Sequence, residues 1–226
     1  MTPSSTRQCP GGLFVVFEGL DGAGKTTQLQ LLATHLRQAG YEVVCLKEPT
    51  DGPWGQKIRQ LAQHGRHKVT PDTELEWFLE DRREDVAQNI CPALAEGHIV
   101  LLDRYYFSTI AYQGAMGYDP EIIRQRNEAF APQPDLLLLL EITPQQGLRR
   151  IRLQRGLDGF EQLDYLRRVA AIFAAMCFPY LRRIPATVAP EIVHTRICRE
   201  VHRALAQKNA ASPGEAATRA TGQCRP

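Results

Sequence analysis

The sequence lacks any apolar run that approaches the roughly 20 residues a membrane-spanning helix needs. The stretch from Met1 to Pro10 has no apolar core of the kind found in signal peptides. The formal net charge is only +2, which is too small to indicate a nucleic acid polymer as the main partner. We therefore expect neither a membrane nor a nucleic acid polymer as partner.

Cysteines at the short spacing typical of zinc sites are absent as well. Six cysteines are scattered along the chain and none forms a C-x-x-C pair, so a zinc site is not expected. Several lie in apolar segments, as reduced core cysteines do. This use of cysteine predicts a reducing, cytoplasmic setting.

The length and composition are those of an ordinary globular protein. At 226 residues, with 43% apolar and 23% charged residues, the chain is expected to form one domain. No internal repeat is present. Composition places this domain at 12–207, between a flexible N-terminus at 1–11 and a disordered C-terminal tail at 208–226.

Short apolar segments typical of strands alternate with segments in which apolar residues recur at helical spacing. Strands are expected at about 13–18, 42–46, 98–103, 135–141 and 184–188. Helices are expected at about 25–38, 54–64, 72–96, 120–129, 160–181 and 192–206, with another opened by Thr143 and Pro144. The pattern predicts an α/β fold of three layers, with a five-stranded parallel sheet between helices.

The first strand turns into the first helix through a glycine-rich loop. Gly19, Gly24, Lys25 and Thr26 match the pattern Gly-x-x-x-x-Gly-Lys-[Ser/Thr] of a phosphate-binding P-loop. Main-chain N–H groups and the helix N-terminus would bind the phosphates of ATP, Lys25 would reach the β- and γ-phosphates, and the Thr26 hydroxyl would ligate Mg²⁺. The residues expected to bind the nucleotide are Gly19, Leu20, Asp21, Gly22, Ala23, Gly24, Lys25, Thr26 and Thr27. A plain glycine turn is the alternative. An Asn-Lys-x-Asp guanine motif is absent, which disfavours a GTPase switch.

An arginine lies on the inward stripe of the helix expected at about 72–96. Arg82 follows Phe78 by one turn, and an aromatic ring beside a guanidinium suits a nucleobase. The alternative is a core phenylalanine with Arg82 paired to an acid, Glu48 or Asp103. The pattern alone leaves both interpretations open.

Two further groups of polar residues follow the later strands. Arg104, Ser108 and Tyr112 recur at steps of four, with Gln113 beside them, which places them on one helix face. This face is either a polar ligand site or a solvated surface. The second group consists of four arginines ahead of the turn at 156–159, which resembles a flap over phosphates or else a solvated basic helix end: Arg149, Arg150, Arg152 and Arg155.

Taken together in this order, these motifs resemble the thymidylate kinase family over about residues 13–206. The segment Asp-Arg-Tyr-Tyr-Phe-Ser-Thr-Ile-Ala-Tyr-Gln-Gly at 103–114 is similar to the most distinctive motif of that family. The resemblance implies a P-loop NTPase fold with a lid, usually as a homodimer. It also implies transfer of the γ-phosphoryl group of ATP to dTMP, with Mg²⁺, to give dTDP and ADP.

The resemblance assigns roles to residues by position. Asp21 would contact the acceptor phosphate region and the sugar 3′-hydroxyl, and Arg104 would hold the acceptor phosphate. Phe78 would stack on thymine and Arg82 would bond to its O4, which favours the ligand interpretation of that pair. Tyr112 and Gln113 would line the base and sugar pocket, and Ser108 is also expected to bind the substrate.

The family places its catalytic arginine either in the phosphate loop or in the lid. Gly22 occupies the loop position here, so the resemblance implies a bacterial-like lid type, with Arg155 as the catalytic arginine and Arg150 and Arg152 as the next candidates. The expected catalytic residues are Lys25, Arg155, Asp21 and Arg104.

Some positions depart from the family pattern. Lys47 stands where an arginine precedes Glu-Pro in many members, Gly159 replaces a second lid arginine, and Pro185 replaces an aspartate. The alternatives are therefore a kinase for another pyrimidine nucleoside monophosphate, and a nucleotide-binding regulator without turnover.

Overall fold

The computed structural model describes Cys9 and residues 11–64, 69–155 and 160–210, with side chains of 62–64, 151–155 and 160–162 excepted. A five-stranded sheet lies at its centre, in the order β2-β3-β1-β4-β5, and all neighbouring strands are parallel. The strands are β1 (Leu13–Glu18), β2 (Val43–Lys47), β3 (Ile99–Asp103), β4 (Leu136–Glu141) and β5 (Leu181–Pro185). The predicted fold class and parallel sheet are confirmed.

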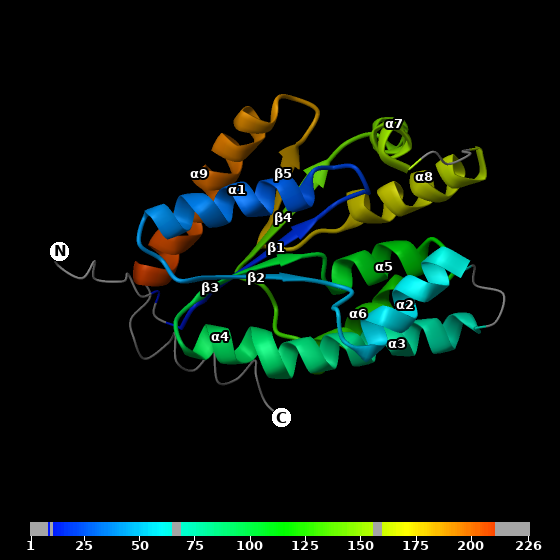
Figure 1. Ribbon diagram of the computed structural model, residues 1–226, viewed down its shortest axis with the longest axis horizontal. Helices are drawn as coiled ribbons and strands as arrows, with labels where there is room; N and C mark the ends of the chain where they lie inside the picture. The colour runs from blue at the N-terminus through cyan, green and yellow to red at the C-terminus, as the bar shows by residue number, and fades with distance from the viewer. Residues whose placement is uncertain (1–8, 10, 65–68, 156–159, 211–226) are drawn as a thin grey trace.

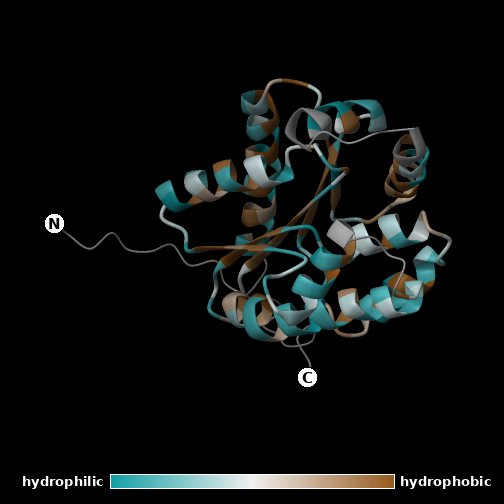
Figure 2. Cartoon of the chain, turned by 45° about the vertical axis from the view of Figure 1, so that its right-hand side comes forward, coloured by the Kyte–Doolittle hydropathy of each residue, from teal (hydrophilic) through white to brown (hydrophobic). Residues whose placement is uncertain are grey.

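Helices cover both faces of the sheet (Figure 1). They are α1 (Lys25–Gln38), α2 (Pro53–His64), α3 (Pro71–Asp85), α4 (Cys91–Ala95), α5 (Tyr106–Gly114), α6 (Pro120–Glu128), α7 (Pro144–Arg155), α8 (Phe160–Ala175) and α9 (Pro190–Ala210). The hydrophobic colouring gathers on the strands and on the inward faces of these helices (Figure 2).

The alternation of side chains along β1 divides the core in two. Phe14 and Val16 pack on the side of α3, α5 and α8. Leu13, Val15 and Phe17 pack on the other side, against α1 and α9. Because β1 is buried on both faces, its sequence is a continuous apolar run.

The long helix expected at about 72–96 is interrupted. A π-helical turn, Val86–Ile90, separates α3 from α4. Pro92 follows at the start of α4, where it has no N–H to donate to the preceding turn. The ladder of hydrogen bonds therefore changes register at this point.

The end of the chain differs more from the prediction. The helix expected to reach about residue 181 ends at Ala175, and the last strand begins at Leu181, earlier than the predicted 184. Leu137 N donates to Tyr180 O, and Leu181 pairs with Leu137. The segment that begins at Leu181 therefore forms a strand that pairs with β4, although its sequence has a helical period. Helix α9 reaches Ala210, beyond the expected boundary at 207, while 211–226 and most of 1–11 lie outside the described residues.

The cysteines are not all in one state. Cys9, Cys45, Cys177 and Cys198 have free thiols, whereas Cys91 is disulfide-bonded. The expectation of reduced cysteines is therefore wrong for Cys91. Among the described helices, none has the length and apolar character needed to cross a bilayer.

Candidate active site

The P-loop connects the carboxyl end of β1 to the first turn of α1. Gly19 and Gly22 have φ values of 135° and 81°, which favour glycine. A Cβ on Gly22 would lie 2.9 Å from the carbonyl oxygen of Gly147 in α7, so the loop and that helix pack without side chains between them. Helix α1 has Gly24 as its N-cap and no side-chain cap, which leaves its first N–H groups for an anionic ligand.

Lys25 lies folded against this loop. Its Nζ donates to the carbonyl oxygens of Gly19 and Leu20, at 2.9 and 3.0 Å. Burial, together with the nearby Arg104 guanidinium, lowers the pKa of Lys25 to about 8. The ammonium group therefore lies where it can meet phosphate groups bound by the loop.

Thr26 and Asp103 meet at the carboxyl ends of the strands. The Thr26 hydroxyl donates a hydrogen bond to the Asp103 carboxylate. They line a cavity of about 350 Å³, together with Lys47, Thr50 and Asp51. A hydroxyl and a carboxylate are the hard oxygen donors that Mg²⁺ prefers, so the residues fit that ion. The sequence interpretation assigned only Thr26 to the metal, although an aspartate at a strand end is a recognisable signal in P-loop proteins.

Arg104 joins three of the predicted site residues. Its guanidinium pairs with the Asp21 carboxylate, and its Nη1 donates to Ser108 Oγ at 2.9 Å. The Arg104 guanidinium carbon lies 5.3 Å from the centre of the Tyr112 ring, whose hydroxyl donates to Asp21 Oδ2 at 3.4 Å. The structure therefore brings Asp21, Arg104, Ser108 and Tyr112 together.

The reason for this grouping differs from the predicted one. Arg104 precedes α5, which begins at Tyr106, so it does not share a helix face with Ser108 and Tyr112. Its φ of 72° makes it the one non-glycine residue with positive φ in the described part of the chain. This backbone conformation, rather than helical spacing, turns the side chain toward Ser108.

Glu18 holds the start of α5 beside this cluster. The sequence did not predict it as a site residue. This fully buried carboxylate accepts hydrogen bonds from the N–H groups of Tyr105 and Ser108, both at 2.9 Å, and from the Ser108 hydroxyl at 2.7 Å. Burial raises the pKa of Glu18, and the Arg104 charge opposes that rise. The signal in the sequence was a glutamate ending an otherwise apolar strand.

Arg82 is in the core and has an acidic partner. Its Nη2 lies 2.5 Å from Glu48 Oε2, and its Nη1 donates to Asn127 Oδ1 at 2.6 Å. This is the pairing that the sequence left open as the alternative for Arg82, and Phe78 lies half-buried one turn earlier. The sequence named Glu48 as one of two possible acidic partners, whereas it did not indicate Asn127.

Several buried polar atoms in this region, Glu48 Oε1 among them, have no hydrogen-bond partner among the described residues. Arg82 Nε and Gln113 Oε1 are buried without a hydrogen bond in the described part of the chain. Because buried polar atoms usually have partners, both are candidates for bonds to a ligand.

The arginines of α7 are only partly described. Arg150 donates to Gly22 O at 2.9 Å and to Ala186 O at 3.2 Å, so it braces the P-loop. Arg149 is exposed. The side chains of Arg152 and Arg155, and the turn 156–159, lie outside the described residues, so the flap interpretation stays a prediction.

The local start of α7 follows the sequence rule. Thr143 Oγ1 accepts from Gln146 N, and Gln146 Oε1 accepts from Thr143 N, at 3.2 and 3.0 Å. This reciprocal capping arrangement confirms the predicted N-cap.

Known proteins of one family resemble this chain over most of its length. The family model described as thymidylate kinase matches residues 17–197. A thymidylate kinase of Desulfotalea psychrophila is 51% identical over 86% of this chain and 96% of its own length. One of Xanthomonas campestris pv. campestris (strain B100) is 48% identical over 88% and 87%. A probable thymidylate kinase of Archaeoglobus fulgidus is 47% identical over 71% and 80%. The chain belongs to the thymidylate kinase family.

Proposed function

We propose that this chain transfers the γ-phosphoryl group of ATP to dTMP, giving dTDP and ADP. The observation that carries the proposal is that the P-loop adjoins the Asp21, Arg104 and Tyr112 cluster. A donor bound by the loop and an acceptor bound by Arg104 would then meet at Asp21 and Lys25. Phosphoryl transfer requires this kind of positioning more than it requires covalent chemistry by the protein.

The donor side consists of the P-loop amides, Lys25 and Thr26. The unpaired N–H groups at the start of α1 bind phosphate oxygens, and Lys25 exchanges its bonds to Gly19 and Leu20 for bonds to phosphate. Thr26 and Asp103 would hold Mg²⁺, which supplies neutralisation of phosphate charge when bound.

The acceptor side consists of Arg104 with the residues of α3 and α5. Arg104 is held by Asp21 and Ser108 in an orientation for a monophosphate. Phe78 offers a half-buried ring for stacking on the base. Arg82 Nε and Gln113 Oε1 are available for the edge of the base.

A further arginine from α7 would complete the site. Arg155 supplies a guanidinium to the transferring phosphoryl group, as in lid-type members of the family. Arg150 braces the P-loop through Gly22 and is a positioning residue in this proposal. In this proposal the enzyme is a cytoplasmic homodimer. Analytical ultracentrifugation tests whether it is a dimer.

An acceptor panel tests the proposal. With ATP and Mg²⁺, kcat/KM for dTMP is expected to exceed that for dUMP, dCMP and UMP. Phe78→Ala is expected to raise the KM for dTMP, while Trp77→Ala, a change in the neighbouring half-buried aromatic, serves as the control. If kcat/KM for another pyrimidine monophosphate equalled that for dTMP, the assignment of dTMP as the acceptor would be withdrawn. If the protein bound ATP but formed no ADP with any acceptor, it would be a regulator.

A further inference from the structure

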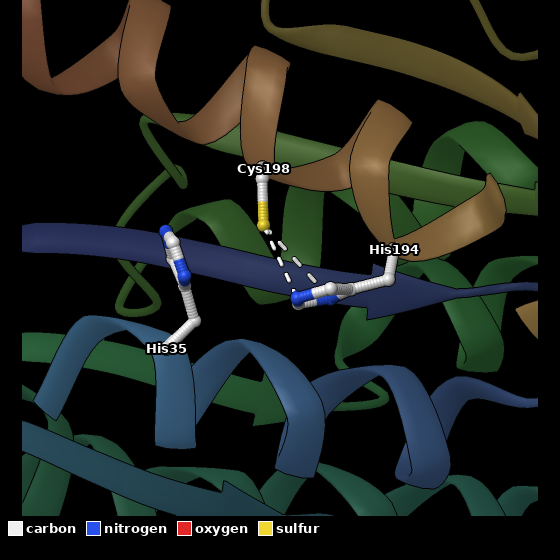
Figure 3. A group of neighbouring side chains, drawn as sticks. All are labelled: His35, His194 and Cys198. Carbon is white, nitrogen blue, oxygen red and sulfur yellow. Dashed lines mark hydrogen bonds between the residues drawn. The ribbon is translucent and has the colours of Figure 1, made fainter. Parts of the chain in front are cut away.

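Three metal-binding side chains converge on the face of the molecule formed by α1 and α9. His35 extends from α1, and His194 and Cys198 extend from α9 into the space between the two helices (Figure 3). One ligand atom from each lies within 4.8 Å of the other two. The phosphate-binding residues Lys25 and Thr26 lie at the start of α1, ten and nine residues earlier than His35, so the group lies outside the site described above.

The packing of α9 explains why these side chains are accessible. Its buried stripe consists of Val193, Ile197, Val201 and Leu205, at steps of four. His194 and Cys198 each follow a member of this stripe by one residue, so they lie at the edge of the interface. All three ligands are half-buried, which leaves them reachable by an ion from solvent.

One distance between two ligand atoms in this group already fits tetrahedral coordination of a zinc ion. Ligand atoms about 2.0 to 2.3 Å from a zinc ion lie roughly 3.4 to 3.7 Å apart in tetrahedral geometry. Cys198 Sγ is already 3.4 Å from His194 Nε2. His35 Nε2 is also 3.4 Å from Nε2 of His202, one turn further along α9, but His202 is not among the three residues whose ligand atoms all lie within 4.8 Å of one another.

The donor set selects the class of ion. Imidazole nitrogen and thiolate sulfur suit Zn²⁺, whereas Mg²⁺ and Ca²⁺ prefer oxygen.

We propose that His35, His194 and Cys198 form a zinc site that joins α1 to α9, with the fourth position open to water. The bound ion would fix the helix whose first turn carries Lys25 and Thr26. The expectation of no zinc rested on the absence of a C-x-x-C pair, a signal that a site assembled from two distant helices does not produce.

Metal titration of the full chain without nucleotide tests the site. The protein is expected to bind one Zn²⁺ per chain, and its Co²⁺ form is expected to show the visible bands of tetrahedral cobalt and a near-ultraviolet thiolate-to-cobalt band. Cys198→Ser should lose the thiolate band, and both Cys198→Ser and His35→Gln should weaken Zn²⁺ binding by at least about tenfold.

Cys177→Ser is the matched control, because Cys177 is a free, exposed thiol remote in sequence from the cluster. Its Zn²⁺ affinity and Co²⁺ spectrum should equal those of the unsubstituted protein. The proposal is overturned if the unsubstituted protein binds no Zn²⁺, or if its affinity is unchanged in both Cys198→Ser and His35→Gln. Far-ultraviolet circular dichroism identifies a variant that fails to fold, and the other substitution then decides.

Discussion

Arg82 and Glu48 form an ion pair that is buried on both sides. Arg82 Nη2 lies 2.5 Å from Glu48 Oε2, and the two side chains are only 2% and 4% exposed. Arg82 also donates to Thr109 Oγ1 at 3.2 Å. The pair therefore links α3 to the segment after β2 and to α5, and it fixes the guanidinium before any base arrives.

Removing one partner of this pair is expected to destabilise the fold. Arg82→Met leaves Glu48 buried without its counter-charge, which costs about 3 to 5 kcal/mol of unfolding free energy. Urea denaturation measures the loss. Arg83→Met is the control, since Arg83 is half exposed in its contact with Glu80 and should lose less than about 1 kcal/mol. Equal effects in the two variants would argue that the buried pair contributes nothing special.

Thr26 is expected to set the requirement for Mg²⁺. Thr26→Ala removes the hydroxyl that bonds to Asp103, so the Mg²⁺ concentration for half-maximal activity should rise by about tenfold or more. Thr26→Ser keeps the hydroxyl and should remain near the unsubstituted enzyme. A Mg²⁺ titration of kcat that gave the same midpoint for Thr26→Ala would remove Thr26 from the metal site.

Lys25 should make ATP binding dependent on pH. Its pKa is lowered to about 8 by burial and by Arg104, so the free enzyme carries the ammonium charge below that pH and loses it above. ATP dissociation constants should rise from pH 7.5 to 9, by up to about tenfold. Lys25→Arg keeps its charge and should flatten this dependence; a slope identical to that of the unsubstituted enzyme would assign the titration elsewhere.

Asp85 should lower stability above its folded pKa. Burial raises the pKa of Asp85 to about 6, from an ordinary value of 3.8. The folded state therefore holds the proton of Asp85 more tightly than the unfolded state does. The contribution of Asp85 to the free energy of unfolding falls as the pH rises from about 4 to 6. Above pH 6, Asp85→Asn should be more stable than the unsubstituted protein by up to about 3 kcal/mol, with little difference near pH 4.

Asp81→Asn is the comparison for Asp85, because Asp81 accepts hydrogen bonds from Thr50 N and Thr50 Oγ1 at 2.9 and 2.6 Å. That substitution is expected to destabilise the protein at pH 8, by about 1 to 3 kcal/mol. Thermal unfolding at pH 4 and pH 8 distinguishes the two residues. If Asp81→Asn stabilised the protein and Asp85→Asn had no effect, Asp85 would not carry the unfavourable charge.

Arg155 and Arg150 should affect the kinetics differently. Arg155→Ala is expected to lower kcat more than it raises KM, because the contact proposed for Arg155 would form chiefly in the transition state. Arg150→Ala removes the brace on Gly22 O and should raise the KM for ATP as well. Steady-state kinetics measure both, and a rise in KM alone for Arg155→Ala would indicate that another arginine acts on the phosphoryl group.

Local sequence patterns were sufficient for most of the fold. The strand at Leu13–Glu18 and the helix at Lys25–Gln38 agree with their predicted bounds, because a continuous apolar run and a helical period are properties of neighbouring residues. The last strand was misplaced, since its position depends on pairing with β4 across more than 40 intervening residues.

The sequence by itself determined the phosphate loop, the parallel α/β class and the family. Only the tertiary structure decided that Arg82 pairs with Glu48 and that Thr26 meets Asp103. It alone also decided that Glu18 holds the start of α5 and that His35 faces Cys198. The physical reason is that glycine turns and apolar periods act between adjacent residues, whereas these contacts join segments that the strand order β2-β3-β1-β4-β5 brings together.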